Sequence, residues 1–381
     1  MSVRALTARL DARKWLILAT VIGLLALQLA HSPAARADEG GSFVQTDLVS
    51  DLPGAKFLDP NLKNPWGLAL GPTSPWWVAD NNGNVSTLYT GNGNPFSLVV
   101  DIPTPTTPKG GAPTGIVFNS NPHDFVVPGG GASDGSRFIF ATEDGTIAGW
   151  NPTFNLTQAV IAVDNSNVPP GANNGAVYKG LAIAKTEEGQ MLYAANFRTG
   201  TVDVYDSKWD RVEEPGAFLD SHVPDGFAPF GIQEIGGRIL VSYAKQKPDR
   251  HDDLSGPGNG FVDIFNTEGR LLKRLIKHGA LNSPWGMALA PEGFGDHEGD
   301  LLVGNFGDGR INAYNIESGE FLGALRRPDG SAIEISGLWG IAFGNGAIAG
   351  PRTTLFFAAG INDEKDGLFG SLQVAKAAES D

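Results

Sequence analysis

The stretch Asn64–Leu70, which reads N-P-W-G-L-A-L, decides the fold because the chain repeats it in altered form. A near copy, S-P-W-G-M-A-L-A, occupies Ser283–Ala290. Six tripeptides that contain an aromatic residue or proline end in a glycine, and these glycines are Gly67, Gly115, Gly180, Gly231, Gly286 and Gly340. The intervals between them are 48, 65, 51, 55 and 54 residues, so the sequence predicts six repeated units of similar length.

Each repeated glycine opens a short apolar strand, and further strands follow before the next glycine. In the first unit a second strand is expected at Trp76–Ala79, and the turn Asp80–Gly83 follows it. A third strand ends on Tyr89, and a fourth is expected at Ser97–Val100. Polar, glycine-bearing turns between such strands are hairpin signals. Four antiparallel strands per unit, repeated radially, predict an all-β fold, a six-bladed β-propeller.

The sixth unit is one strand short, and the chain offers a strand to complete it. Its third strand, Leu368–Val374, nearly ends the chain, whereas Phe43–Val49 precedes the first unit and has no unit of its own. We expect Phe43–Val49 to join the last blade as its outer strand. This pairing would close the ring and leave no open strand edge at the seam.

The first 37 residues have the pattern of a cleavable signal peptide. A basic start precedes an apolar run at Trp15–Ala30, and Ala35 and Ala37 stand in the A-x-A arrangement of a cleavage site. The run is shorter than the ~20 residues that span a bilayer. We therefore expect export to the periplasm or the extracellular space, a single propeller domain over residues 38–375, and a tail over residues 376–381.

The charge of the mature chain excludes some partners. The chain has 28 basic and 42 acidic residues, and residues 1–37 hold five and one of these, which leaves 23 against 41 and a net charge of −18. Such an acidic surface disfavours nucleic acid and anionic membranes. The absence of cysteine excludes disulfides and thiolate chemistry. We expect a monomer without a membrane span, whose partner is a small molecule or a protein of the cell envelope.

The motifs at Asn64–Leu70 and Ser283–Ala290, with the turn V-A-D-N-N-G-N at Val78–Asn84, resemble NHL-type six-bladed propellers. From about Phe43 to Val374 the chain more closely resembles a family of exported bacterial propellers, some of which carry PEP-CTERM sorting tails. No such tail is recognised in the sequence, so the resemblance carries no expectation of cell-surface sorting by that route. The resemblance implies the propeller fold and export, and it implies no particular chemistry.

One end of the predicted channel is expected to carry the ligand site. The loops that enter each innermost strand and the loops between second and third strands share that end. The candidate ligand-binding residues on these loops are Trp66, Lys179, Phe230, Arg198, Lys245, Trp285 and Trp339. The aromatic members could form a platform for a flat ligand or a sugar. Alternatively they pack between blades, because they recur at one position of the repeat.

Four oxygen-bearing side chains occupy similar positions just after second strands, and they are Asp80, Glu143, Asn196 and Asn305. Carboxylate and amide oxygens that converge on one axis would suit Ca²⁺. Six-bladed lactonases of the gluconolactonase type have a similar arrangement, although no lactonase motif is present. The alternative is turn chemistry, since Asp and Asn are favoured in tight hairpins.

The insertion Lys245–Asn259 is the longest departure from the repeat on this end. It is a candidate lid or binding loop, and four of its residues could bind a metal or move protons: Asp249, His251, Asp252 and Asp253. A solvated charged loop is the alternative. The turn Asn362–Gly367 of the sixth unit is weakly similar to half a calcium loop, but it lacks the required spacing to a terminal Glu.

Two functions remain open from the sequence, and a quinone-dependent dehydrogenase is a more distant third. One is a binding scaffold in the cell envelope or the extracellular space. The other is a Ca²⁺-dependent hydrolase or lyase that acts on a small carbonyl or lactone substrate. In the second, His251 or Glu143 would be the catalytic base.

Overall fold

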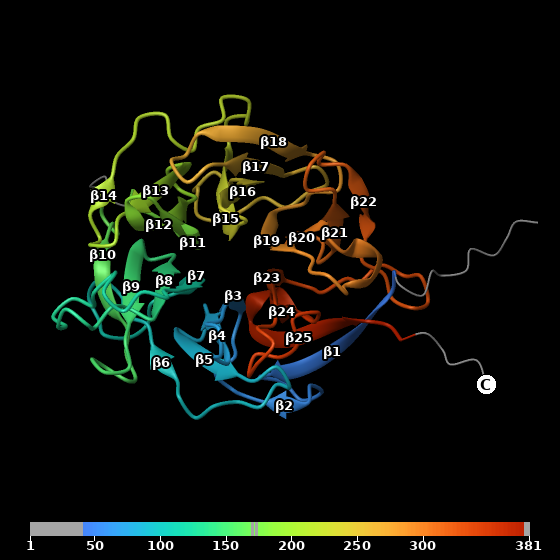
Figure 1. The fold of residues 1–381 in the computed structure, drawn as a ribbon, viewed down its shortest axis with the longest axis horizontal. Coiled ribbons are helices and arrows are strands. Elements are labelled where there is room, and N and C mark those ends of the chain that lie inside the picture. The colour runs from blue at the N-terminus through green and yellow to red at the C-terminus, as the bar shows by residue number, and fades with distance from the viewer. Residues whose placement is uncertain (1–40, 169–170, 172–173, 377–381) are drawn as a thin grey trace, which may run out of the picture.

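The computed structural model describes residues 41–168, 171 and 174–376. The predicted signal peptide and nearly all of the predicted tail lie outside the described residues. Six sheets stand in a ring around a central axis (Figure 1), so the predicted six-bladed β-propeller is confirmed. No helix in the described part of the chain is long and apolar enough to cross a membrane.

Blades 1 to 5 are four-stranded antiparallel sheets whose first strand lines the channel (Figure 1). Blade 1 contains β3 (Pro65–Ala69), β4 (Trp76–Asp80), β5 (Val85–Tyr89) and β6 (Val100–Asp101). Blade 2 contains β7 (Pro113–Phe118), β8 (Phe138–Thr142), β9 (Thr146–Trp150) and β10 (Val160–Asp164). Blade 3 contains β11 (Tyr178–Thr186), β12 (Gly189–Asn196), β13 (Thr201–Tyr205) and β14 (Arg211–Val212). Blade 4 contains β15 (Phe227–Ile235), β16 (Arg238–Lys245), β17 (Phe261–Phe265) and β18 (Leu271–Lys277). Blade 5 contains β19 (Pro284–Leu289), β20 (Leu301–Asn305), β21 (Ile311–Tyr314) and β22 (Phe321–Ala324), with a 3-10 turn at Gly295–His297 between its first two strands.

Blade 6 joins the two ends of the propeller. It contains β23 (Leu338–Phe343), β24 (Leu355–Gly360), the short α2 (Ile361–Glu364), β25 (Asp366–Val374) and β1 (Phe43–Ser50). Strand β1 pairs antiparallel with β25, from Phe43 opposite Val374 to Ser50 opposite Leu368. The short β2 (Phe57–Leu58) adds to β1 in parallel. The predicted closure by the N-terminal strand is therefore confirmed, and the two strands lie side by side in Figure 1.

The six repeated glycines are the contact points between neighbouring innermost strands. A Cβ atom built on Gly231 would lie 2.0 Å from the carbonyl oxygen of Trp285 in the next blade. The corresponding distance from Gly340 to the carbonyl oxygen of Trp66 is 2.4 Å, and this contact crosses the seam of the ring. A side chain larger than hydrogen would therefore push neighbouring blades apart at the axis. This close approach explains why the motif recurs once per blade.

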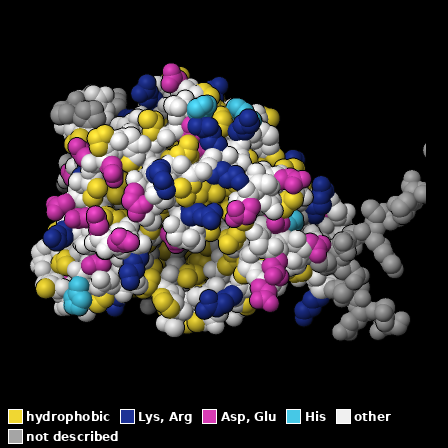
Figure 2. All heavy atoms as spheres, turned by 45° about the horizontal axis from the view of Figure 1, so that its top comes forward, with side chains coloured by type: hydrophobic (Ala, Val, Ile, Leu, Met, Phe, Trp, Pro, Cys, Tyr) yellow, Lys and Arg dark blue, Asp and Glu magenta, His cyan; other side chains and the backbone are white. Residues whose placement is uncertain are grey.

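The hydrophobic core lies between the faces of adjacent blades. Trp77 on β4 stacks on Phe138 of β8, with ring centroids 4.1 Å apart, and so joins blades 1 and 2. The outer strand β1 of blade 6 also contributes to this core, since Phe43 and Val49 are both fully buried. Charged side chains of both signs cover the surface between exposed apolar atoms (Figure 2).

A buried carboxylate in blade 4 gives the fold a predictable pH dependence. Asp263 on β17 is 1% exposed, and burial, followed by the neighbouring charge of Asp220, raises its pKa to about 7. Arg274 lowers the pKa of Asp263 without cancelling this effect. Between about pH 4 and 7 the native state therefore keeps a proton that the unfolded chain has released. Stability is lost as the pH rises through this window.

We expect the replacement Asp263→Asn to remove this contribution. The difference in unfolding free energy between variant and wild type should grow in favour of the variant from pH 4 to 7, by at most about 1.4 kcal/mol per pH unit. Above pH 7 it should level off. Urea denaturation at a series of pH values measures the difference, with the exposed Asp225→Asn as control. A difference that does not change with pH would show that Asp263 keeps an ordinary pKa.

Candidate functional site

The two sets of loops meet at one end of the channel, as expected. Asn81, in the turn after β4, donates a 2.9 Å hydrogen bond to Glu143 in the turn after β8. Lys179, near the start of β11, forms an ion pair with the same carboxylate. Asn64, just before β3, donates to Glu364 of α2 at 3.2 Å. We call this end the channel mouth and define it by Asn64, Asn81, Glu143, Lys179, His251, Asp252 and Glu364.

The aromatic candidates form a buried cluster below the channel mouth. Trp66 stacks on Trp339 with ring centroids 3.5 Å apart, and Trp285 lies edge-on to both. Phe230 contacts Trp339, and these four side chains are at most 9% exposed. Trp285 also lines a cavity of about 320 Å³ farther along the channel, between the innermost strands. This arrangement agrees with the packing alternative, and ligand binding by the aromatic rings stays a prediction.

A buried ion pair occupies the centre of the channel mouth. Lys179 is 2% exposed, and its Nζ atom lies 3.5 Å from Asp252 as well as beside Glu143. Burial lowers the pKa of Lys179, but attraction by Glu143 and Asp252 outweighs it, so the pKa is raised. Burial by itself would raise the pKa of Glu143. The charge of Lys179 and the hydrogen bonds from Lys179 and Asn81 outweigh burial, so the pKa of Glu143 is lowered. Both groups are therefore charged at neutral pH, and both carboxylate oxygens of Glu143 are hydrogen-bonded.

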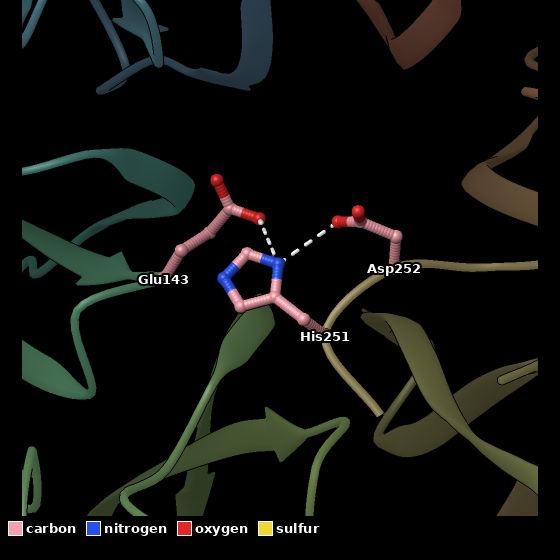
Figure 3. A group of neighbouring side chains, drawn as sticks. All are labelled: Glu143, His251 and Asp252. Carbon is pink, nitrogen blue, oxygen red and sulfur yellow. Dashed lines mark hydrogen bonds and ion pairs between the residues drawn. The ribbon is translucent and has the colours of Figure 1, made fainter. Parts of the chain in front are cut away.

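The insertion Lys245–Asn259 lies over this ion pair. His251 Nδ1 is 2.9 Å from Asp252 Oδ1 and 4.0 Å from Glu143 Oε1 (Figure 3). The hydrogen bond from His251, assisted by Lys179, holds the pKa of Asp252 well below its usual range. The loop is anchored by Asp253, which accepts hydrogen bonds from Ser255 and Ser283. The insertion therefore places His251 and Asp252, which are hydrogen-bonded to each other, beside the ion pair of Lys179 and Glu143.

One group of possible metal ligands lies in the part of the chain that the structure describes. Ligand atoms of Glu143, His251 and Asp252 all lie within 4.8 Å of one another. Lys179 Nζ stands beside the same two carboxylates, so a metal ion here would compete with a resident ammonium group. Glu143 is the one predicted calcium ligand in this group. Asp80, Asn196 and Asn305 are not part of it.

Asp80 has a different environment from Glu143. It is fully buried at the end of β4, where its Oδ2 accepts a 2.8 Å hydrogen bond from the Thr87 hydroxyl. Burial raises the pKa of Asp80 well above its usual range. Binding of Ca²⁺ requires an ionised carboxylate, and burial disfavours that form of Asp80.

Asn196 and Asn305 use their side chains to close local turns. Asn196 Oδ1 faces backbone N–H groups of Val177 and Thr199, each at 3.4 Å. Asn305 accepts from the backbone of Asn282 at 3.1 Å and donates to a nearby carbonyl at 2.8 Å. These bonds agree with the turn alternative. A calcium ion shared by all four candidates stays a prediction.

The remaining candidates lie around the charged centre. Arg198 donates to the carbonyl oxygen of Gly175 at 3.0 Å, and Lys245, at the end of β16, is half-buried. The sequence placed Asn81 on this face without selecting it, and it named Asp252 as a possible metal ligand or proton carrier. It named Glu364 only as part of a weak calcium-loop pattern in the sixth unit, and it missed Asn64 as a site residue. Asn64 could have been found because it directly precedes the Pro-Trp-Gly motif.

Comparison with known proteins places the chain among viral relatives. No protein-family model matches it. Two uncharacterized proteins of Acanthamoeba polyphaga mimivirus are 31% identical over 327 and 328 residues, which cover 84% of this chain and 76% and 82% of theirs. The chain belongs to the same family as these mimivirus proteins. A bacterial source and a relation to NHL-type or PEP-CTERM propellers stay predictions.

Solved structures with the same fold have very different sequences. The soluble aldose sugar dehydrogenase of Escherichia coli has a TM-score of 0.56 at 11% identity and covers 87% of this chain and 99% of its own. Virginiamycin B lyase of Staphylococcus aureus has a TM-score of 0.50 at 13% identity, with the same coverage. Likeness at this identity supports the propeller fold alone.

Proposed function

We propose that the protein is an exported propeller that binds a ligand at the channel mouth, and that it acts as a binding scaffold in the cell envelope or the extracellular space. One observation carries this proposal. Glu143 of blade 2 and Asp252 of blade 4 both lie beside the ammonium group of Lys179 on blade 3, and Asn81 of blade 1 donates a hydrogen bond to Glu143. Convergent polar groups above an apolar floor are typical of small-molecule sites.

The charge state of the centre favours binding over proton transfer. Glu143 is held ionised, and both its oxygens are already engaged, so it is poorly placed to take a proton. Burial and the nearby charge of Glu143 raise the pKa of both Asp144 and Glu364. A ligand with a positive charge or several hydrogen-bond donors would relieve this crowding of carboxylates. We therefore propose a small organic cation as the class of ligand.

The metal-dependent hydrolase or lyase remains the second candidate, and a specific observation favours it. Glu143, His251 and Asp252 present their ligand atoms to one another across the mouth (Figure 3). A metal held by these residues would polarise a substrate carbonyl. It would also have to displace Lys179 from the two carboxylates.

Thermal melting of the purified protein separates the two functions. We expect small amines and guanidines to raise the melting temperature, because ligands that bind only the native state stabilise it. Ca²⁺, Mn²⁺, Zn²⁺ and EDTA should have no effect, because a metal ion would have to displace Lys179 from Glu143 and Asp252, whereas an organic cation can pair with the half-exposed Asp252 without displacing Lys179. The half-exposed Asp252→Asn should abolish the shift with amines, whereas the exposed Glu292→Gln should retain it. The opposite result would be stoichiometric metal in elemental analysis and a melting temperature that EDTA lowers, both absent in His251→Ala. That result would favour the enzyme and contradict the scaffold.

A further inference from the structure

The outer strand of blade 3, β14, is only two residues long. Strand β14 pairs with Val204 and Tyr205 of β13 and with no earlier residue of that strand. In blade 4 the pairing of β18 extends along the whole of β17, from Phe261 opposite Lys277 to Phe265 opposite Leu271. The outer edge of β13 from Thr201 to Asp203 therefore has no strand partner among the described residues. Unpaired edges of this kind can accept another strand.

Blade 1 shows how this chain covers a strand edge when its outer strand is short. Strand β6 is also two residues long. There, however, Pro95 bridges to Tyr89, and the backbone N–H of Phe96 donates to Leu88 at 2.9 Å. These contacts protect the part of β5 that β6 does not reach. The described residues provide no such cover for Thr201–Asp203 in blade 3.

A groove of about 780 Å³ lies along this open edge. Its apolar lining includes Met191, Val204 and Phe218, and it also contains the open-edge residues Thr201–Asp203. The exposed acidic residues that line it are Glu187, Glu188, Glu213, Glu214 and Glu268.

The charge of the groove is strongly one-sided. Arg211 is the single basic residue that lines it, and its guanidinium is paired with Asp203 at 3.0 Å. The guanidinium also lies 3.9 Å from Glu213, so the other four glutamates are left without a cation in the groove. Their field repels nucleic acid and anionic membranes and attracts basic segments of protein.

We propose that this groove docks an extended, basic peptide segment of a partner protein, which adds as a strand to the open edge of β13. Main-chain hydrogen bonds to Thr201–Asp203 would supply affinity. Alternate apolar side chains would enter the floor, and lysine or arginine side chains would reach the glutamates. The site is on the outer part of blade 3, away from the axis, and does not depend on ligand binding at the channel mouth.

Fluorescence anisotropy with labelled synthetic peptides tests the proposal on the purified full chain. The probes alternate lysine with valine or phenylalanine, and matched probes carry glutamate in place of lysine. We expect the basic probes to bind saturably and more weakly as salt increases. The acidic probes should not bind. Hydrogen exchange should show slower exchange of amides in Thr201–Val204 when the basic probe is bound.

Variants and a modified peptide locate the site. The exposed side chains of Glu188 and Glu214 make no hydrogen bond or ion pair with other described residues, so Glu188→Lys with Glu214→Lys should fold normally. This double variant should bind the basic probes roughly tenfold more weakly or worse. The exposed Glu292→Lys, in blade 5, should leave binding unchanged. Probes with N-methylated backbone amides should lose affinity. Absence of binding by every basic probe, equal binding by the double variant, or full binding of the N-methylated probes would each overturn the proposal.

Discussion

Replacing Gly231 with alanine should lower the free energy of unfolding by about 3 kcal/mol. The new methyl group would lie 2.0 Å from the carbonyl oxygen of Trp285 and 2.8 Å from the Ser242 hydroxyl. The first of these atoms belongs to the backbone of the next blade, so relief requires a shift of blade 5 against blade 4. Because the ring is closed, such a shift is transmitted to the other blades. Urea denaturation followed by tryptophan fluorescence measures the loss.

Replacements at two other glycines provide comparisons for the size of the stability loss expected at Gly231. At Gly180 the nearest atom to a new Cβ is the carbonyl oxygen of Phe230, at 2.9 Å, so Gly180→Ala should cost less. At Gly131 the nearest atom is a side-chain oxygen of Asp134, at 3.4 Å, and its replacement should change stability by less than about 0.5 kcal/mol. A loss at Gly231 no larger than at Gly131 would refute the view that the motif glycines set the spacing of blades.

Replacing Lys179 with methionine should cost about 3 kcal/mol of stability. Methionine keeps much of the volume of the lysine stem but removes the charge that neutralises Glu143. The carboxylate would then be left in a largely buried position without its partner. In this variant burial is no longer opposed by Lys179, so the pKa of Glu143 should rise. Stability should therefore recover as the pH falls and Glu143 takes up a proton.

A double-mutant cycle checks the pairing of Lys179 with Glu143. Adding Glu143→Gln to Lys179→Met should restore part of the lost stability, because it removes the unpaired charge. The double variant should therefore lose less stability than the sum of the losses in the two single variants. Lys179→Met as stable as the wild type, or no recovery in the double variant, would show that the buried pair is not coupled.

The architecture was predictable because it depends on a pattern that recurs within the sequence. The motif around Gly67 and Gly286 identifies an innermost strand wherever it occurs, since every blade meets its neighbour through the same backbone contact. The missing strand of the sixth unit and the spare strand at Phe43–Val49 then determined how the ring closes. Both predictions follow from the local sequence pattern and from the number of strands in each unit.

The composition of the site was predictable only in part. The repeat indicated which loops share the channel mouth, and it therefore placed Glu143, Lys179 and His251 at one end. It also grouped Glu143 with Asp80, although the structure leaves Asp80 inside blade 1, where Thr87 is its hydrogen-bond partner. Equivalent positions in a repeat have similar backbones, but the partners of each side chain differ with the loops around it.

The sequence by itself determined the number of blades, the closing strand and the end of the channel that carries polar loops. Only the tertiary structure decided that Lys179 pairs with Glu143 and that the insertion brings His251 and Asp252 onto them. It also decided that no described strand pairs with the outer edge of β13 at Thr201–Asp203. The physical reason is that these features depend on contacts between segments from different blades or on how far an irregular loop reaches. Neither a repeat period nor a hydrophobic pattern specifies such contacts.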